Sequence, residues 1–161
     1  MSGAEPGSPP PRGTSDPATG KSAPGLAIVL FAGGFDRVHY GLALAASAAA
    51  LSRPVHLLFS GRAVLALTAA SPARPGWHQL DAADDGVPAA QRDQVLVARG
   101  VAGFEELLEA CAALEVQVLV CEMALRALGL ANDALRPDFP HQIGGIISFL
   151  SRTQSAQTLF I

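Results

Sequence analysis

The chain has 161 residues and a mass of 16.5 kDa, which is the size of one domain. Eleven lysine and arginine residues stand against fourteen aspartate and glutamate residues, so the formal net charge is -3. This balance argues against a dedicated nucleic-acid binder, which usually carries a basic stripe. Two cysteines are too few for a disulfide scaffold and indicate free thiols in a reducing compartment.

Residues 1–24 are interpreted as a disordered tail, and residues 25–161 as the folded domain. The tail is rich in proline, glycine and serine and contains no leucine, isoleucine, valine or phenylalanine. It therefore buries too little apolar area to offset its ordering entropy. It also lacks the apolar segment of a signal peptide, and the apolar stretch that follows it is too short to span a membrane. We expect a cytoplasmic protein without a membrane span.

The first regular element is a continuous apolar run over residues 26–31, which is typical of a strand buried on both faces. Asp36 is the expected N-cap of an alanine-rich helix that continues to about residue 51 and packs closely on the sheet. A second strand is expected over residues 55–59 and a short helix over residues 61–68. The next segment, residues 71–94, is the least regular internal part, and loops of this length often form lids or binding loops.

In the second half, apolar residues at helical spacing predict an amphipathic helix over residues 104–114. A third strand covers residues 116–120 and ends at Cys121. A last helix over residues 146–151 and a C-terminal strand over residues 157–161 complete the expected elements. Strands that alternate with helices predict an α/β fold with a mainly parallel sheet.

Ligands of parallel α/β sheets sit at the carboxyl ends of the strands. Two marked positions follow strands in this way: the turn from Gly33 to Asp36, and Cys121. The glycine pair lacks the G-x-G-x-x-G spacing of a dinucleotide fold, so it is a weak motif by itself. Asp36 can be either a helix cap or a functional carboxylate. His39 can be either a packed structural histidine or a residue of the site.

The two cysteines lie in different sequence contexts. Cys111 lies on the apolar stripe of its expected helix, where a small buried side chain is the usual outcome. Cys121 lies between a strand end and a helix start, whose backbone N–H groups stabilise a thiolate. Plain packing fits Cys121 equally well. The carboxylate of Glu122 would oppose activation if it faced the sulfur, and Arg126 would favour activation if it turned inward.

Three stretches together resemble the DsrE/DsrF-like sulfur-relay family. Residues 30–39 look like that family's first strand, glycine turn and Asp-Lys/Arg-Val-His helix start. Residues 121–129 match its cysteine segment in length, with the cysteine, the first methionine and the glycine in register. Residues 143–150 are similar to its glycine pair and final apolar helix. The sequence departs from the family pattern where Leu125, Arg126 and Leu128 replace methionines and an acidic residue.

The resemblance implies a three-layer, flavodoxin-like α/β fold with about five strands, often found as a homo-oligomer. It also implies that Cys121 carries persulfide sulfur between partners such as rhodanese-like donors and TusA-like acceptors. The alternative is a non-catalytic binding or assembly subunit of the same fold, in which Cys121 is a structural thiol. No cofactor and no metal are expected. The candidate residues lining the site are Gly33, Gly34, Asp36, His39, Met123 and Arg126.

Overall fold

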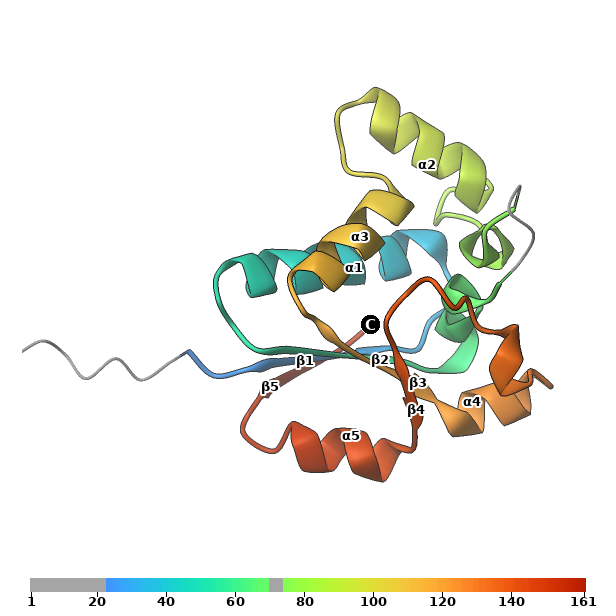
Figure 1. Ribbon diagram of the computed structural model, residues 1–161. Helices are drawn as coiled ribbons and strands as arrows, with labels where there is room; N and C mark the ends of the chain where they lie inside the picture. Colours follow the sequence, from blue (N-terminus) through green and yellow to red (C-terminus); the bar gives the residue numbers. More distant parts are fainter. Residues whose placement is uncertain (1–22, 70–73) are drawn as a thin grey trace, which may run out of the picture.

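The computed structural model describes residues 23–69 and 74–161, and the greater part of the expected tail, residues 1–22, lies outside the described residues. The described chain forms one five-stranded sheet in the order β4-β3-β2-β1-β5, with every neighbouring pair parallel (Figure 1). The strands are β1 (Leu26–Leu30), β2 (Val55–Phe59), β3 (Gln117–Cys121), β4 (Gln142–Gly144) and β5 (Gln157–Phe160).

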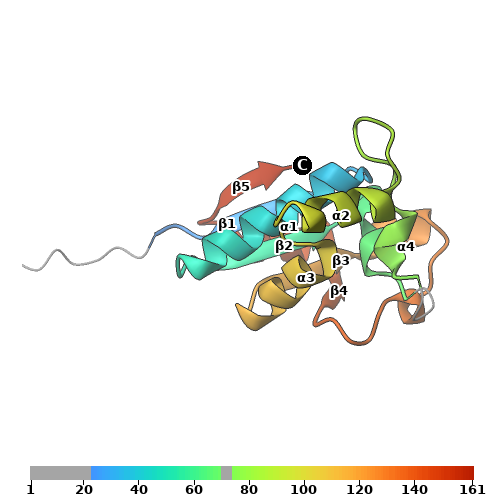
Figure 2. The same cartoon turned by 90° about the horizontal axis from the view of Figure 1, so that it is seen from above.

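Helices cover both faces of the sheet. Figure 1 shows α1 and α3 on one face, with α2 above them, while α5 and α4 lie on the other. Seen from above, α1 and α3 lie side by side across the strands (Figure 2). The expected α/β fold with three layers and a parallel sheet of five strands is confirmed. The α-helices are α1 (Phe35–Ala50), α2 (Ala89–Ala98), α3 (Phe104–Ala113), α4 (Glu122–Ala127) and α5 (Ile146–Arg152).

The apolar run of β1 is explained by its central place in the sheet. It pairs with β2 from Leu26 opposite Val55, and with β5 from Leu26 opposite Gln157. Because α1 covers one face and other elements cover the second, Ala27 and Ile28 are both fully buried although they point to opposite faces. A strand that is buried on both faces therefore has a continuous apolar sequence without alternating polar residues.

Small side chains let α1 approach the sheet closely, as its composition indicates. A Cβ atom placed on Gly41 would lie 2.4 Å from a methyl carbon of Leu30 in β1. Ala45 and Ala48 are buried on the same helix. The helix therefore lies against β1 at a distance that larger residues would not allow.

The structure corrects the start of this helix. Asp36 is not the N-cap, because the helix begins at Phe35 and Gly34 occupies the cap position. The Gly34 carbonyl oxygen accepts the backbone N–H of Val38 at 3.1 Å, which closes the first turn without a side-chain cap. The Asp36 carboxylate turns to a distant segment instead.

The irregular segment is shorter than its composition indicates. A 3-10 helix forms over Gly76–Gln79, and α2 already begins at Ala89, so the prediction of an irregular stretch up to residue 94 is wrong at its end. Pro88 precedes α2 with φ -56°, a backbone angle suited to a helix start. Residues 70–73 of this segment lie outside the described residues.

One strand has no counterpart among those assigned from the sequence. The three residues of β4 pair with β3 from Leu119 opposite Gln142 to Cys121 opposite Gly144. An edge strand this short carries too few residues for an alternating pattern to be recognised. Its position nevertheless places the backbone of Gly144 beside Cys121.

Candidate functional site at the carboxyl edge of the sheet

Parallel pairing brings the expected site segments to one edge. Leu30 at the end of β1 pairs with Phe59 at the end of β2, and Phe59 pairs with Val120 in β3. The glycine turn after β1 and Cys121 at the end of β3 therefore lie at the same edge, with β2 and the turn after it between them. This is the edge at which parallel α/β sheets bind ligands.

Cys121 is both the last residue of β3 and the N-cap of α4, with extended backbone angles of φ -71° and ψ 115°. Its side chain is fully buried, with 0% of its surface exposed. The helix that follows it has only six residues. The thiol thus lies at the expected helix start, but it is covered in this conformation.

The charged neighbours of Cys121 pair with each other. Arg126 forms an ion pair with Glu122 one turn earlier, and both side chains are substantially exposed. Met123 is exposed as well. Neither the carboxylate that would oppose a thiolate nor the guanidinium that would stabilise one is buried with the thiol. Arg126 and Met123, both candidate lining residues, belong to the outer surface of α4.

Cys111 is a core residue, as expected. It is fully buried in α3, and its Sγ lies 3.7 Å from the carbonyl oxygen of Leu42 in α1. Burial raises the pKa of the Cys111 thiol to about 11, because a thiolate there would be poorly solvated. At neutral pH this cysteine is a protonated thiol in the interface between two helices.

The glycine turn is filled by the chain itself. A Cβ on Gly33 would lie 2.6 Å from the Cβ of Arg62 and 2.7 Å from a carboxylate oxygen of Asp81. Arg62 donates two-point hydrogen bonds to Asp81, from Nη2 at 2.6 Å and from Nε at 3.0 Å. The Asp81 backbone N–H also donates to the Gly33 carbonyl oxygen at 2.8 Å. Gly33 is required for this close approach, and the neighbouring Gly34 caps α1.

Asp36 and His39 hold loops rather than surround the thiol. The Asp36 carboxylate accepts the backbone N–H of Asp84 at 2.9 Å and lies 3.6 Å from Nε of Arg92. The Nε2–H of the buried His39 donates to the carbonyl oxygen of Ala102 at 2.8 Å, and its ring stacks on another aromatic ring of α1. Both residues fasten the segments around α2 to the start of α1.

A mostly apolar pocket of about 370 Å³ opens at this edge beside α4. Its walls come from the turns after β1 and β2 and from one face of α4. Sequence reasoning missed most of these residues, although the turn after β2 must reach the same edge of a parallel sheet. Cys121 is not part of the lining but begins the helix that forms one wall. The lining residues are Phe31, Ala32, Gly33, Gly61, Arg62, Ala124, Ala127 and Leu128.

Across residues 23–69 and 74–161, no three histidine, cysteine, aspartate or glutamate side chains gather as metal ligands. In the same residues, no helix has the length and apolar character needed to cross a membrane.

Comparison with known proteins gives one family match. The model of the DsrE/DsrF-like family matches residues 27–160, which is nearly all of the described chain. Among solved structures, the ychN protein from E. coli is similar, with 17% sequence identity and a TM-score of 0.48 over 85% of this chain and 99% of that chain. No curated protein matches the sequence.

Proposed function

Because the chain belongs to the DsrE/DsrF-like family, we propose that it is a sulfur-relay protein that carries persulfide sulfur on Cys121. The observation that supports this most directly is the position of Cys121. It ends β3 at the carboxyl edge of the sheet and begins a helix, where backbone N–H groups stabilise a thiolate. Cys111 is the less suitable carrier, because burial between two helices raises the pKa of its thiol to about 11.

The proposed transfer needs only thiols. The Cys121 thiolate attacks the outer sulfur of a donor persulfide, R–S–SH. A new S–S bond forms to Cys121 as the donor's S–S bond breaks, and the donor leaves as R–S⁻. An acceptor thiolate then attacks the outer sulfur of Cys121–S–SH in the same way and releases the Cys121 thiolate. Each step exchanges one S–S bond for another, so no external oxidant or reductant is consumed.

A buried thiol must become accessible for this chemistry. The element next to Cys121 that can open at low cost is α4, which has six residues and an exposed ion pair between Glu122 and Arg126. Short surface elements open locally at a small fraction of the free energy of global unfolding. In this proposal, a docking partner binds beside α4 and shifts it away from Cys121. The mostly apolar pocket along α4 offers the contact surface.

The partners proposed for the relay are a rhodanese-like donor and a TusA-like acceptor, with the protein itself as a homo-oligomer. Mass spectrometry tests the carrier directly after incubation with a persulfide donor. Wild-type protein and Cys111→Ser are expected to gain the mass of one sulfur atom, and Cys121→Ser is expected to gain none. Retained loading in Cys121→Ser would overturn the proposal.

A second candidate is a binding or assembly subunit in which Cys121 is a structural thiol. The complete burial of Cys121 is the observation that favours it. The two candidate functions differ in whether a partner transfers sulfur to Cys121 or only binds beside α4. If loading of wild-type Cys121 stays absent with donor and acceptor proteins present, while a partner still binds beside α4, the binding subunit is the correct interpretation.

A further inference from the structure

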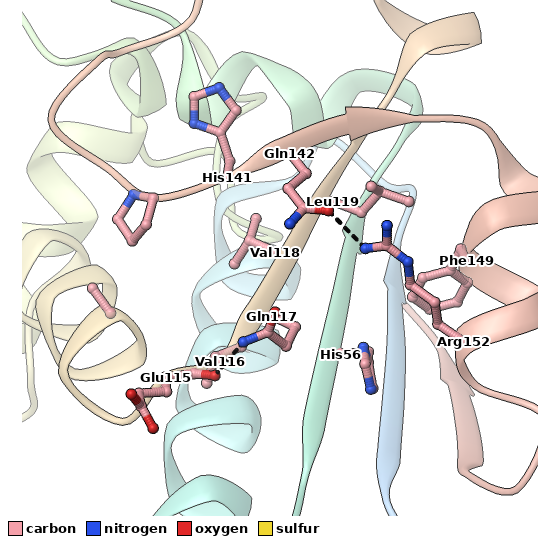
Figure 3. A pocket seen from close by; sticks show the side chains of 12 residues that line it. His56, Glu115, Val116, Gln117, Val118, Leu119, His141, Gln142, Phe149 and Arg152 are labelled. Carbon is pink, nitrogen blue, oxygen red and sulfur yellow. Dashed lines mark hydrogen bonds between the residues drawn. The ribbon is translucent and has the colours of Figure 1, made fainter.

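A second cavity lies at the opposite, amino-terminal end of the sheet. It has a volume of about 320 Å³ and is bordered by the start of β2, β3 and β4 and by the end of α5 (Figure 3). Its place along β3 separates it from the thiol. β3 lines it from Gln117 to Leu119, and Cys121, two positions farther along the strand, is not among the lining residues. The sulfur-relay proposal uses none of its residues.

An arginine and a histidine side chain border this cavity. Arg152 reaches in from the end of α5, and His56 comes from β2 (Figure 3). The side chain of Arg152 makes one hydrogen bond in the described part of the chain, from Nη1 to Oε1 of Gln142 at 2.7 Å. No carboxylate within the described residues forms an ion pair with it, unlike Arg62 or Arg136. Its guanidinium therefore keeps N–H donors and an uncompensated positive charge for a ligand.

The proximity of His56 and Arg152 has an electrostatic consequence. Partial burial and the positive charge of Arg152 lower the pKa of His56 below its ordinary 6.5. A protonated His56 is thus disfavoured in the empty cavity, and an anion placed between the two side chains would remove that penalty. The other titratable groups at the cavity are Glu115, before β3, and His141, before β4. The Nδ1–H of His141 donates to the Phe139 carbonyl oxygen at 2.8 Å.

The remaining surface selects the kind of anion. On the face of β3 that carries α5, the buried side chains of Leu119 and Phe149 form an apolar floor. The volume lies at the lower end of the range of small-molecule sites, about 300–1,000 Å³. The carboxylate of Glu115 lies across β3 from Arg152 and His56 (Figure 3), so it leaves their positive charge uncompensated. An apolar body with a carboxylate suits the floor and the volume, whereas a free phosphate group has no apolar part to place on the floor.

We propose that this cavity is a binding site for a small monocarboxylate, whose carboxylate lies between Arg152 and His56 and whose apolar body rests on Leu119 and Phe149. Arg152 provides a fixed positive charge and paired N–H donors, the geometry that suits a carboxylate. His56 adds a second positive charge when it is protonated. Binding therefore strengthens as the pH falls below 6.5, where the bound anion favours the charged imidazole.

Benzoate is the probe, and benzamide is its uncharged counterpart of nearly the same shape. Binding to the full chain is followed by NMR through the ring signals of the probe compound in every variant, and through the ring signals of His56 where this residue is present. We expect saturable benzoate binding with a Kd of about 1 mM or tighter, and at least tenfold weaker binding of benzamide. Absence of saturation, or equal binding of the two compounds, would overturn the proposal.

Arg152→Gln keeps a hydrogen-bonding side chain and removes the charge. It is expected to weaken benzoate binding at least tenfold. The matched control is Arg99→Gln, because Arg99 is also an exposed arginine at the C-terminal end of a helix but lies outside the cavity. Arg99→Gln is expected to bind benzoate like the wild type. Equal binding by Arg152→Gln and Arg99→Gln would contradict the assignment.

His56→Gln provides a second test if Arg152→Gln does not fold, as judged by circular dichroism. This variant is expected to bind benzoate without the strengthening that the wild type shows below pH 6.5. An unchanged pH dependence in His56→Gln would reject the role of His56. None of these measurements involves sulfur transfer, so the outcome is independent of the sulfur-relay proposal.

Discussion

At the scale of single residues, the two cysteines are buried to the same extent but differ in what buries them. Cys111 lies between α1 and α3, the most extensively contacting pair of helices in the fold, and its carbonyl contact is to Leu42. Cys121 is followed directly by the short helix α4 at the edge of the sheet. Exposing Cys111 requires separation of two core helices, whereas exposing Cys121 requires movement at one end of the sheet.

Alkylation is therefore expected to distinguish the two thiols. In native protein at pH 7, iodoacetamide should label Cys121 faster than Cys111, because the pKa of about 11 leaves Cys111 almost entirely protonated. Peptide mapping after timed labelling measures both rates. In denaturant the two rates should become similar, which serves as the control. Faster labelling of Cys111 in the native protein would contradict our choice of active thiol.

Gly33 gives a prediction about stability. Gly33→Ala introduces a methyl group at 2.6 Å from the Arg62 Cβ, so the turn and the Arg62–Asp81 pair must shift. We expect a loss of about 1–3 kcal/mol in the free energy of unfolding, the usual cost of overpacking. Gly86→Ala strains the chain for a different reason. Its Cβ would meet no atom within 4 Å, but Gly86 has φ 83°, a backbone angle that alanine rarely adopts. Denaturant unfolding of Gly33→Ala with unchanged stability would show that the turn has room to adjust.

At the scale of elements, the segment between η2, the 3-10 helix at Gly76–Gln79, and α2 is fastened by acid–arginine contacts. Asp81 pairs with Arg62, and Asp85 pairs with Arg92, which also approaches Asp36. The Arg62 and Arg92 hydrogen bonds hold the pKa of Asp81 and of Asp85 below the ordinary value of 3.8. The Asp85–Arg92 contact lies within residues 71–94, which the sequence predicted to be irregular, and the other two contacts join this segment to Arg62 and Asp36 outside it. Together they account for its defined path.

The depressed pKa values determine how this segment responds to acid. A carboxylate with a lowered folded-state pKa stabilises the fold above the unfolded value, and this stabilisation is lost as the pH falls through the folded-state pKa. We therefore expect amide protection around residues 81–88 to decrease below pH 3.8 before the core opens. Hydrogen exchange followed by mass spectrometry measures it.

Asp81→Asn is the matched variant for this measurement. It removes the charge that Arg62 faces and should loosen the segment already at neutral pH. The acid response that remains should come from Asp85. If wild type and Asp81→Asn showed the same protection at neutral pH, the ion pair would have no part in fastening the segment.

At the scale of the whole molecule, apolar side chains remain exposed on the face covered by α5. Ile147 is 82% exposed, and Ile146 and Leu150 on the same helix are exposed as well. Phe31 and Phe160 form a further exposed pair, with ring centroids 5.7 Å apart. Exposed apolar groups of this size commonly mark protein interfaces. We propose that the exposed apolar residues of α5, together with the Phe31–Phe160 pair, form the surface for self-association.

Ile147→Asp tests the proposed association. A charge at this position opposes burial in an interface, but the side chain makes little contribution to the core because it is so exposed. We expect light scattering at micromolar concentration to give an oligomer for the wild type and a smaller species for Ile147→Asp. Val97→Asp, on α2, is the control that should leave the mass unchanged. A monomeric wild type would reject the prediction.

The sequence by itself determined the parts that depend on neighbouring residues. Apolar runs predicted β1 and β2 at their observed starts, and helical spacing predicted α3, because burial imposes a local pattern on each element. The family resemblance was confirmed as well. The helix that follows Cys121 was also inferred from the composition of that segment alone.

Only the tertiary structure decided what each candidate side chain contacts. His39 meets a carbonyl oxygen 63 residues away, and Asp36 meets a backbone N–H 48 residues away. The side chains of Arg62 and Asp81 fill the space beside Gly33. Cys121 is buried, whereas the charged side chains of α4 are exposed. Such contacts depend on how the chain folds back across the sheet edge. The spacing of neighbouring residues predicts which face of a helix or strand is buried, but it does not predict which segment packs against that face.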